Sequence, residues 1–327
     1  MKSIFKQFRK QGGIKLIKYW KNHHVLMYSL LLLPFLFASK TGQEEFREAV
    51  SNKIQKKYTK KYSRLMVNEK ELFAKSVGQP NGIVFKKRPI WFCWLQGLNQ
   101  APEIVQFNYA NLISKFGENR VHLVSSDNVL EFIQLPDYII NKWKNGIISN
   151  THFSDIIRLQ LLVQNGGIWI DSTVLVSCKE LPNYLFDDIF FFQTLKPGRN
   201  GLALPLSNWI ISSKPNEIII KRTRNLLLYF WKNTDKLDDY FIFHRLLSVS
   251  MNQFPDELSK MTLVDNSQPH SLLIMSRNYK LKISEMLNIV SLCSFHKLTN
   301  KFENENQREN LLKLINFLGN NSFFHQK

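Results

Sequence analysis

Short apolar runs and amphipathic stretches alternate along the chain from about residue 88 onward. The apolar runs predict buried strands at residues 90–95, 121–125, 168–170 and 189–195 and in the LSNWIISS segment. The amphipathic stretches predict helices at residues 102–116, 137–144, 151–164 and 238–251 and after the LSNWIISS segment. Strands that alternate with helices predict an α/β domain with a largely parallel sheet.

Polar and aromatic residues follow two of the predicted strands. Asp171 comes directly after the strand at 168–170, and Trp94 and Gln96 close the strand at 90–95. Ligands bind beyond the carboxyl ends of the strands in such sheets. We therefore expect these side chains to lie in one pocket.

The basic charge is concentrated in the N-terminal quarter. The chain carries a formal net charge of +18, and residues 1–88 hold 20 lysines and arginines against 5 acidic residues. The remaining 239 residues are close to balanced, with 24 basic against 21 acidic side chains. We therefore divide the chain into a basic helical extension, residues 1–85, and an α/β domain, residues 86–327. Three cysteines without a CxxC pair indicate neither a disulfide framework nor a zinc site.

The extension combines an apolar run with a basic amphipathic helix. The run at 25–38 has 14 residues, fewer than the roughly 20 needed to span a bilayer. An apolar stripe spaced by four follows, at Phe46, Val50, Ile54, Tyr58 and Tyr62, with lysines on the other faces. This pattern favours a helix on an anionic membrane surface. Packing of the same stripe on the main domain is the alternative. Nucleic acid is not expected, because no binding motif is present.

The segment 154–174, SDIIRLQLLVQNGGIWIDSTV, places charges inside an apolar block. Asp155 and Arg158 are three residues apart, so they are neighbours on a helix. They form either a simple ion pair or a carboxylate and a guanidinium presented to a sugar or phosphate ligand. Ser154 adds a hydroxyl. The residue types alone do not separate these interpretations.

The second half of the segment turns from a helix into a strand. Gly166 is suited to end the helix, and Gly167 permits the close approach of backbone or ligand. Asp171 ends the strand, where its carboxylate can bind a divalent cation or a ribose hydroxyl, or can simply form a turn.

The whole segment resembles the signature of the capsular polysaccharide synthesis protein family. The family pattern is S-D-x-x-R followed by G-G-[IL]-[YW]-x-D-x-[DT], and this family is similar to DXD-motif glycosyltransferases such as yeast-type α-mannosyltransferases and the large glucosylating toxins. PIWFCWLQGLNQAPEIV, SNWIISSKPN, DYFIFH and SFHKLTNK resemble other blocks of the family. The resemblance covers about residues 88–301.

The resemblance implies a GT-A-like nucleotide-diphospho-sugar transferase domain. Asp155, Arg158 and Asp171 would be its catalytic residues, with the first two at the hydroxyls of the donor sugar and Asp171 at the ribose and pyrophosphate. The expected donor-binding residues are Trp94, which would stack on the base, Gln96, Ser154, Gly166, Gly167, Asn208 and His244.

The same resemblance implies a divalent cation, Mg²⁺ or Mn²⁺, held by Asp171, Thr173 and His296. Thr173 departs from the DXD pattern, because a hydroxyl is a weaker cation ligand than a carboxylate. The metal is then held by Asp171, His296 and the diphosphate, or is bound weakly, or is not used. Lys297 and Lys301 are candidates for neutralising the charge of the departing diphosphate.

The resemblance implies a nucleotide-sugar-dependent hexosyltransferase that, like the related families, retains anomeric configuration. Its acceptor would be a growing, lipid-linked capsular or other cell-surface polysaccharide. The basic extension would hold it at the cytoplasmic face of the cell membrane as a peripheral or monotopic protein. The alternative is a non-catalytic basic protein that binds membrane or nucleic acid on a degenerate glycosyltransferase fold, and Thr173 is the residue that supports it.

Overall fold

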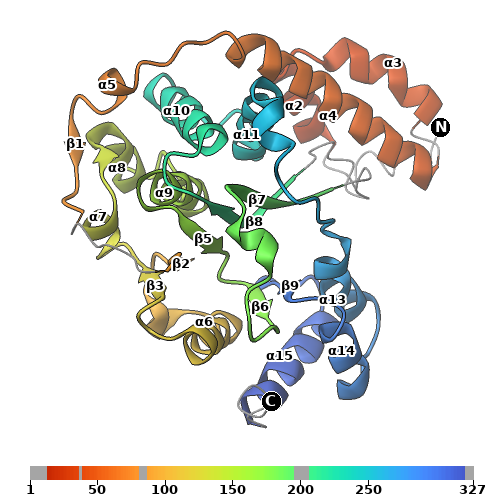
Figure 1. Ribbon diagram of the computed structural model, residues 1–327. Coiled ribbons are helices and arrows are strands. Elements are labelled where there is room, and N and C mark those ends of the chain that lie inside the picture. Colours follow the sequence, from red (N-terminus) through yellow and green to blue (C-terminus); the bar gives the residue numbers. More distant parts are fainter. Residues whose placement is uncertain (1–12, 37–38, 81–86, 195–205, 321–327) are drawn as a thin grey trace.

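The computed structural model describes residues 13–36, 39–80, 87–194 and 206–320. Its centre is a sheet of five strands in the order β3 (Val121–Val124), β2 (Ile90–Cys93), β5 (Gly167–Ile170), β8 (Leu206–Ser213) and β7 (Ile189–Gln193). β2 is parallel to β3 and β5, whereas β8 is antiparallel to both of its neighbours. Four strands therefore run in one direction and β8 in the other, which confirms the predicted α/β class with a mostly parallel sheet (Figure 1).

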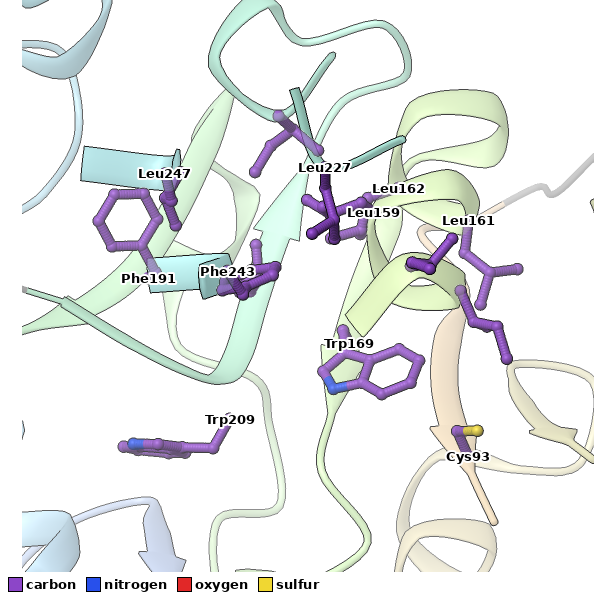
Figure 2. Close-up of a cluster of buried hydrophobic side chains, with 14 of the residues drawn as sticks. Cys93, Leu159, Leu161, Leu162, Trp169, Phe191, Trp209, Leu227, Phe243 and Leu247 are labelled. Atoms are coloured by element: carbon purple, nitrogen blue, oxygen red, sulfur yellow. The ribbon is translucent and has the colours of Figure 1, made fainter. Parts of the chain in front are cut away.

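Helices connect and cover the strands. α6 (Glu103–Phe116) links β2 to β3, and α8 (Asp137–Lys144) and α9 (Asn150–Asn165) precede β5. α10 (Ile218–Lys232) and α11 (Ile242–Gln253) follow β8, and α10 packs on both α9 and α11. Every residue of β2 and β5 is buried, which explains why these strands appear in the sequence as unbroken apolar runs. Figure 2 shows leucines of α9, α10 and α11 gathered with Trp169 and Phe191 in this core.

A second, smaller layer follows the end of β5 in sequence and brings a late part of the chain back to that position. β6 (Val174–Val176) pairs antiparallel with β9 (Phe295–Lys297), so that Val174 lies opposite Lys297. α13 (Ser267–Asn278), α14 (Ile283–Val290) and α15 (Glu305–Asn320) pack around a core of their own. These three helices were not predicted from the pattern of the sequence.

Several short elements complete the described chain. β1 pairs antiparallel with β4. The short elements are α5 (Glu69–Leu72), α7 (Val129–Phe132), α12 (Pro255–Leu258), β1 (Ser76–Val77), β4 (Leu135–Pro136) and the 3-10 helices η1 (Leu98–Gln100) and η2 (Asn183–Phe186). The three cysteines, Cys93, Cys178 and Cys293, are free.

The N-terminal helices α2 (Ile14–Asn22), α3 (Leu26–Leu36) and α4 (Lys40–Tyr62) lie together at the opposite end of the molecule from α15 (Figure 1). The apolar stripe of α4 packs on α11 and belongs to the main core. Arg245 of α11 donates to the carbonyl oxygen of Ser51, and the Gln55 side chain donates to the carbonyl oxygen of Arg245. The stripe is therefore not free to face a membrane, and the packing alternative describes α4. The expected boundary between residues 85 and 86 lies outside the described residues.

A buried ion pair between α11 and the segment before it contacts this helical layer. Nε of Arg245 lies 2.5 Å from Oδ2 of Asp239, which also accepts a hydrogen bond from the hydroxyl of Tyr19. Beside the pair lies a largely apolar cavity of about 470 Å³ between α2, α4 and residues 238–241. Tyr240 and Phe241 form one of its walls.

The outer face of α3 carries exposed apolar side chains. Met27, Leu30, Leu31 and Phe35 are between 46% and 82% exposed, whereas the opposite face packs on α4. Among the described residues, none of the helices combines the length and the apolar character needed to cross a bilayer.

The glycine pair lies at the amino end of β5, where the chain leaves α9. Gly166 and Gly167 both have positive φ, +65° and +108°. A Cβ on Gly166 would lie 2.7 Å from Cδ of Pro215, and one on Gly167 would lie 2.6 Å from the carbonyl oxygen of Pro89. Both glycines are therefore required by close packing between α9, β5 and the neighbouring loops.

We predict that Ile54→Ala destabilises the protein by about 2–5 kcal/mol, because Ile54 is 1% exposed against the main domain. Urea unfolding measures the change. Lys56→Ala, an exposed position on the same helix, should stay within about 0.5 kcal/mol of wild type. Wild-type stability of Ile54→Ala would contradict the packing of α4 on α11.

We predict that Gly167→Ala costs more free energy of unfolding than Gly117→Ala. Gly117 has a φ of +82° with no atom near its absent Cβ, so its substitution measures the backbone strain alone, about 1–3 kcal/mol. Gly167→Ala adds a collision with Pro89 and should cost about 1–3 kcal/mol more. Equal losses of unfolding free energy in the two variants, measured with denaturant, would show that the contact with Pro89 adds no cost.

Candidate active site

A pocket of about 610 Å³ opens beyond the carboxyl ends of β2 and β5. Residues from β8, α9, β9 and the chain before α11 complete its walls. The sequence-predicted residues that line it are Trp94, Gln96, Ser154, Asp155, Arg158, Asp171, Asn208, His244, Lys297 and Lys301, and the pocket also includes Asn150, Thr151, Tyr240, Phe241 and Asn300. The topology therefore brings together most of the residues that the signature singled out.

Arg158 is the centre of the pocket's charged cluster and is only 4% exposed. Its Nη1 lies 3.1 Å from Oδ1 of Asp155 on the same helix, and its Nη2 donates to Oδ1 of Asp171 at 2.9 Å. The guanidinium also lies over the rings of Trp169 and Phe243, at 4.7 and 5.5 Å from their centroids. The ion pair between Asp155 and Arg158 that the spacing predicted is present. Arg158 also bonds to Asp171 and so links α9 to the end of β5.

Asp171 is surrounded by donors. Its Oδ1 accepts from Arg158 and from Nε1 of Trp169 at 2.8 Å, and its Oδ2 accepts from Nζ of Lys297 at 3.1 Å. Burial would raise the pKa of this carboxyl, but Lys297 and Arg158 outweigh burial and hold the pKa below its usual value of 3.8. Asp171 is therefore ionised at neutral pH.

Lys297 also contacts Thr173, the residue that departs from the DXD pattern. Its Nζ donates to Oγ1 of Thr173 at 2.6 Å. The pairing of β9 with β6 continues in a hydrogen bond from the amide of Leu298 to the carbonyl oxygen of Thr173 at 2.8 Å. The backbone therefore places this lysine beside Asp171 and Thr173.

His296 faces away from the pocket. It is fully buried, and its Nε2 lies 3.1 Å from the carbonyl oxygen of Val290 and 3.3 Å from the hydroxyl of Ser177. Burial lowers its pKa to about 4, so the ring is neutral. Neighbouring residues of a strand point to opposite faces, so Lys297 reaches the pocket where His296 does not.

The expected metal ligands are therefore not assembled. Asp171 and Thr173 lie together, but Lys297 bonds to both and His296 lies elsewhere. Within the described ranges, no group of three or more His, Cys, Asp or Glu side chains is placed to hold a metal ion. These residues do not fit a divalent-cation site.

The remaining pocket walls carry polar atoms without partners. Nε1 of Trp94 and Nδ1 of His244 are buried and make no hydrogen bond in the described part of the chain. Burial lowers the pKa of His244 to about 4, so this ring is also neutral. Nδ2 of Asn208 donates to Oδ1 of Asp155 at 3.3 Å and so orients that carboxylate. Both residues line the pocket, where a bound ligand can pair with these nitrogens.

Three of the predicted donor-binding residues have local structural roles. The hydroxyl of Ser154 lines the pocket but donates to the carbonyl oxygen of Thr151, and Ser149 is the residue that caps α9. Gly166 and Gly167 lie at the opposite end of β5 from Asp171 and are not among the residues that line the pocket.

Two buried asparagines that sequence analysis missed hold the chain after Asp171. Asn108 donates to the carbonyl oxygen of Ser172 at 3.0 Å, and Asn111 donates to that of Val176 at 2.8 Å. Both come from the buried face of α6. Amides three residues apart on an otherwise apolar helix face are the signal that would have found them.

Comparison with known proteins places this site in a family. The model of the capsular polysaccharide synthesis protein family matches residues 31–316. O-glycosyltransferase braB of Annulohypoxylon truncatum is 25% identical over 175 residues, which cover 48% of this chain and 41% of that protein. Glycosyltransferase afumC of Aspergillus fumigatus is 34% identical over 101 residues, which cover 27% of this chain and 25% of that protein. The matched part thus spans less than half the length of either relative.

Among solved structures, PaToxG Glycosyltransferase matches 84% of this chain and 96% of its own, at 12% identity and a TM-score of 0.34. A similarity of this size carries no argument about the site. The family model, by contrast, spans most of the chain and includes every pocket residue described above. The chain therefore belongs to the capsular polysaccharide synthesis protein family, and its curated relatives are glycosyltransferases.

Proposed function

We propose that the protein transfers a sugar from a nucleoside-diphosphate-sugar donor to a hydroxyl of a glycan acceptor, on a GT-A-like domain. The observation that carries this proposal is the cluster of Asp155, Arg158 and Asp171 in a pocket at the carboxyl ends of parallel strands. Such pockets are the ligand sites of open α/β sheets. A volume of about 610 Å³ lies in the range of small-molecule and cofactor sites.

Each pocket residue has a role that follows from its contacts. Asp155 accepts hydrogen bonds from the donor sugar's hydroxyls, with Asn208 and Arg158 holding its carboxylate in place. Trp94 offers a ring to the base, together with an Nε1 that has no partner among the described residues, and His244 offers a neutral ring to the sugar side.

The transfer breaks the bond between the sugar's anomeric carbon and the diphosphate oxygen, and the electron pair stays on that oxygen. The acceptor hydroxyl oxygen forms the new bond to the anomeric carbon, and its proton passes to the departing diphosphate or to water. The diphosphate gains one negative charge, so positive groups placed beforehand at this position lower the barrier. We propose a retaining outcome, following the families that the signature resembles.

We further propose that the acceptor is a lipid-linked capsular or other cell-surface polysaccharide at the cytoplasmic face of the membrane. The exposed apolar face of α3 supports a peripheral contact with the bilayer. Lys53 of α4 lies over the ring of Tyr28 on α3, at 5.3 Å, so basic charge adjoins this face. Anionic headgroups attract such charge.

A thermal-shift screen of nucleoside-diphosphate sugars tests the donor site. We predict that at least one donor stabilises the protein, by about 2.7 kcal/mol at a hundredfold excess over its dissociation constant. If no nucleotide sugar stabilises it, the non-catalytic alternative is favoured.

With the donor found, we predict that Asp155→Asn lowers transfer or donor hydrolysis at least about a hundredfold, the scale of losing one positioned polar group. Glu69→Gln is the matched control, since Glu69 pairs with buried Arg224 through α5 and α10, outside the residues that line the pocket. The control should lose stability and keep activity. Full activity of Asp155→Asn would contradict the site assignment.

We predict that the double variant Leu31→Ser, Phe35→Ser binds anionic vesicles about tenfold more weakly or worse, because both side chains are exposed on α3. Sedimentation with vesicles measures the change. Leu263→Ser, a similarly exposed leucine at 65%, should bind as wild type does. Equal vesicle binding by the wild type, the double variant and Leu263→Ser would show that α3 is not the surface that contacts the membrane.

A further inference from the structure

The ammonium group of Lys297 lies where the signature led us to expect a divalent cation. It bonds to Oδ2 of Asp171 at 3.1 Å and to Oγ1 of Thr173 at 2.6 Å, the two side chains predicted to share a metal. The other oxygen of Asp171 is occupied by Arg158 and Trp169. A metal ion on this carboxylate would have to displace the lysine.

The position of Lys297 is set by backbone pairing. Val174 and Lys297 are register partners in the β6–β9 ladder, and the amide of Leu298 bonds to the carbonyl oxygen of Thr173. The side chain is only 21% exposed, on the wall of the pocket. The backbone and the surrounding residues therefore hold Lys297 at this position in the site, whereas an exposed surface lysine would be free to move.

The charges of Asp171 and Lys297 sum to zero, as the charges in a DXD-type metal site do. Two carboxylates and one divalent cation sum to zero, and so do one carboxylate and one ammonium group. Replacement of the second carboxylate by Thr173 removes one negative charge, which matches the change from a divalent to a monovalent cation. The departure at Thr173 and the placement of Lys297 are thus complementary.

An ammonium group has three N–H donors, and Asp171 and Thr173 use two of them. We propose that the remaining donor of Lys297 binds the donor's diphosphate in place of a divalent metal ion, and that sugar transfer by this protein requires no metal. This inference rests on the proposed function. Lys297 is then a catalytic residue, because it touches the leaving group and offsets the negative charge that the group gains. Lys301 adds a second positive charge at the pocket wall.

Isothermal titration of the full chain with UDP and GDP in excess EDTA tests the inference. We expect at least one nucleotide to bind, with an affinity unchanged by Mn²⁺ or Mg²⁺. Lys297→Met should weaken that binding about ten- to a hundredfold, the range for a charged hydrogen bond. Lys297→Arg, which keeps a cation, should retain more affinity than Lys297→Met. Lys280→Met, an exposed and remote lysine, is the charge-matched control and should bind as wild type does.

Activity with the donor found by screening gives a second readout. Turnover should persist in EDTA and fall in Lys297→Met without recovery on addition of Mn²⁺. Nucleotide binding that disappears in EDTA and returns with Mn²⁺ would overturn the role of Lys297 while leaving the proposed transferase intact. Absence of nucleotide binding under both conditions would overturn the proposed function itself. The wild-type titration decides the metal question even if Lys297→Met does not fold.

Discussion

The pairing of Arg158 with Asp171 is the interaction on which the arrangement of this molecule depends. A charge taken out of water needs a partner and hydrogen bonds, and removal of one partner of a buried pair typically costs about 3–5 kcal/mol. The two residues are 13 apart in the sequence and come from a helix and a strand end. To meet at 2.9 Å they require the chain to leave α9, reverse direction and enter β5 within a few residues. The tight turn at Gly166 and Gly167 makes that reversal possible.

Around this pair, positive and negative groups alternate through the pocket: Asp155, Arg158, Asp171 and Lys297. Each of these side chains is held by contacts with its neighbours, so the polar atoms are oriented before a ligand enters. Trp169 and Phe243 cover the faces of the guanidinium and keep water from competing for it. A site built this way needs little reorganisation as charge develops, which is the main source of electrostatic catalysis.

The sequence predicted the parts of the molecule that follow from local periodicity. The strands, α9 and the common location of Trp94 and Asp171 came from the alternation of apolar runs and from the rule that strand ends share an edge. It did not predict which of two neighbours, His296 or Lys297, would face the pocket, because a strand of three residues shows no alternation. The stripe on α4 was visible as an apolar face, but a periodic pattern does not say whether protein or lipid covers it. The glycine pair was equally compatible with ligand contact and with close packing, and only the positions of Pro89 and Pro215 distinguish the two.

The wall formed by Tyr240 and Phe241 belongs to two cavities at once, the polar pocket and the apolar cavity beside α2 and α4. Most compounds that compete for a nucleotide-sugar site must imitate a charged diphosphate and therefore cross membranes poorly. The apolar cavity, at about 470 Å³, has room for a small uncharged molecule. A small molecule bound in that cavity would contact the same wall from the side opposite the candidate active site, without any phosphate mimic.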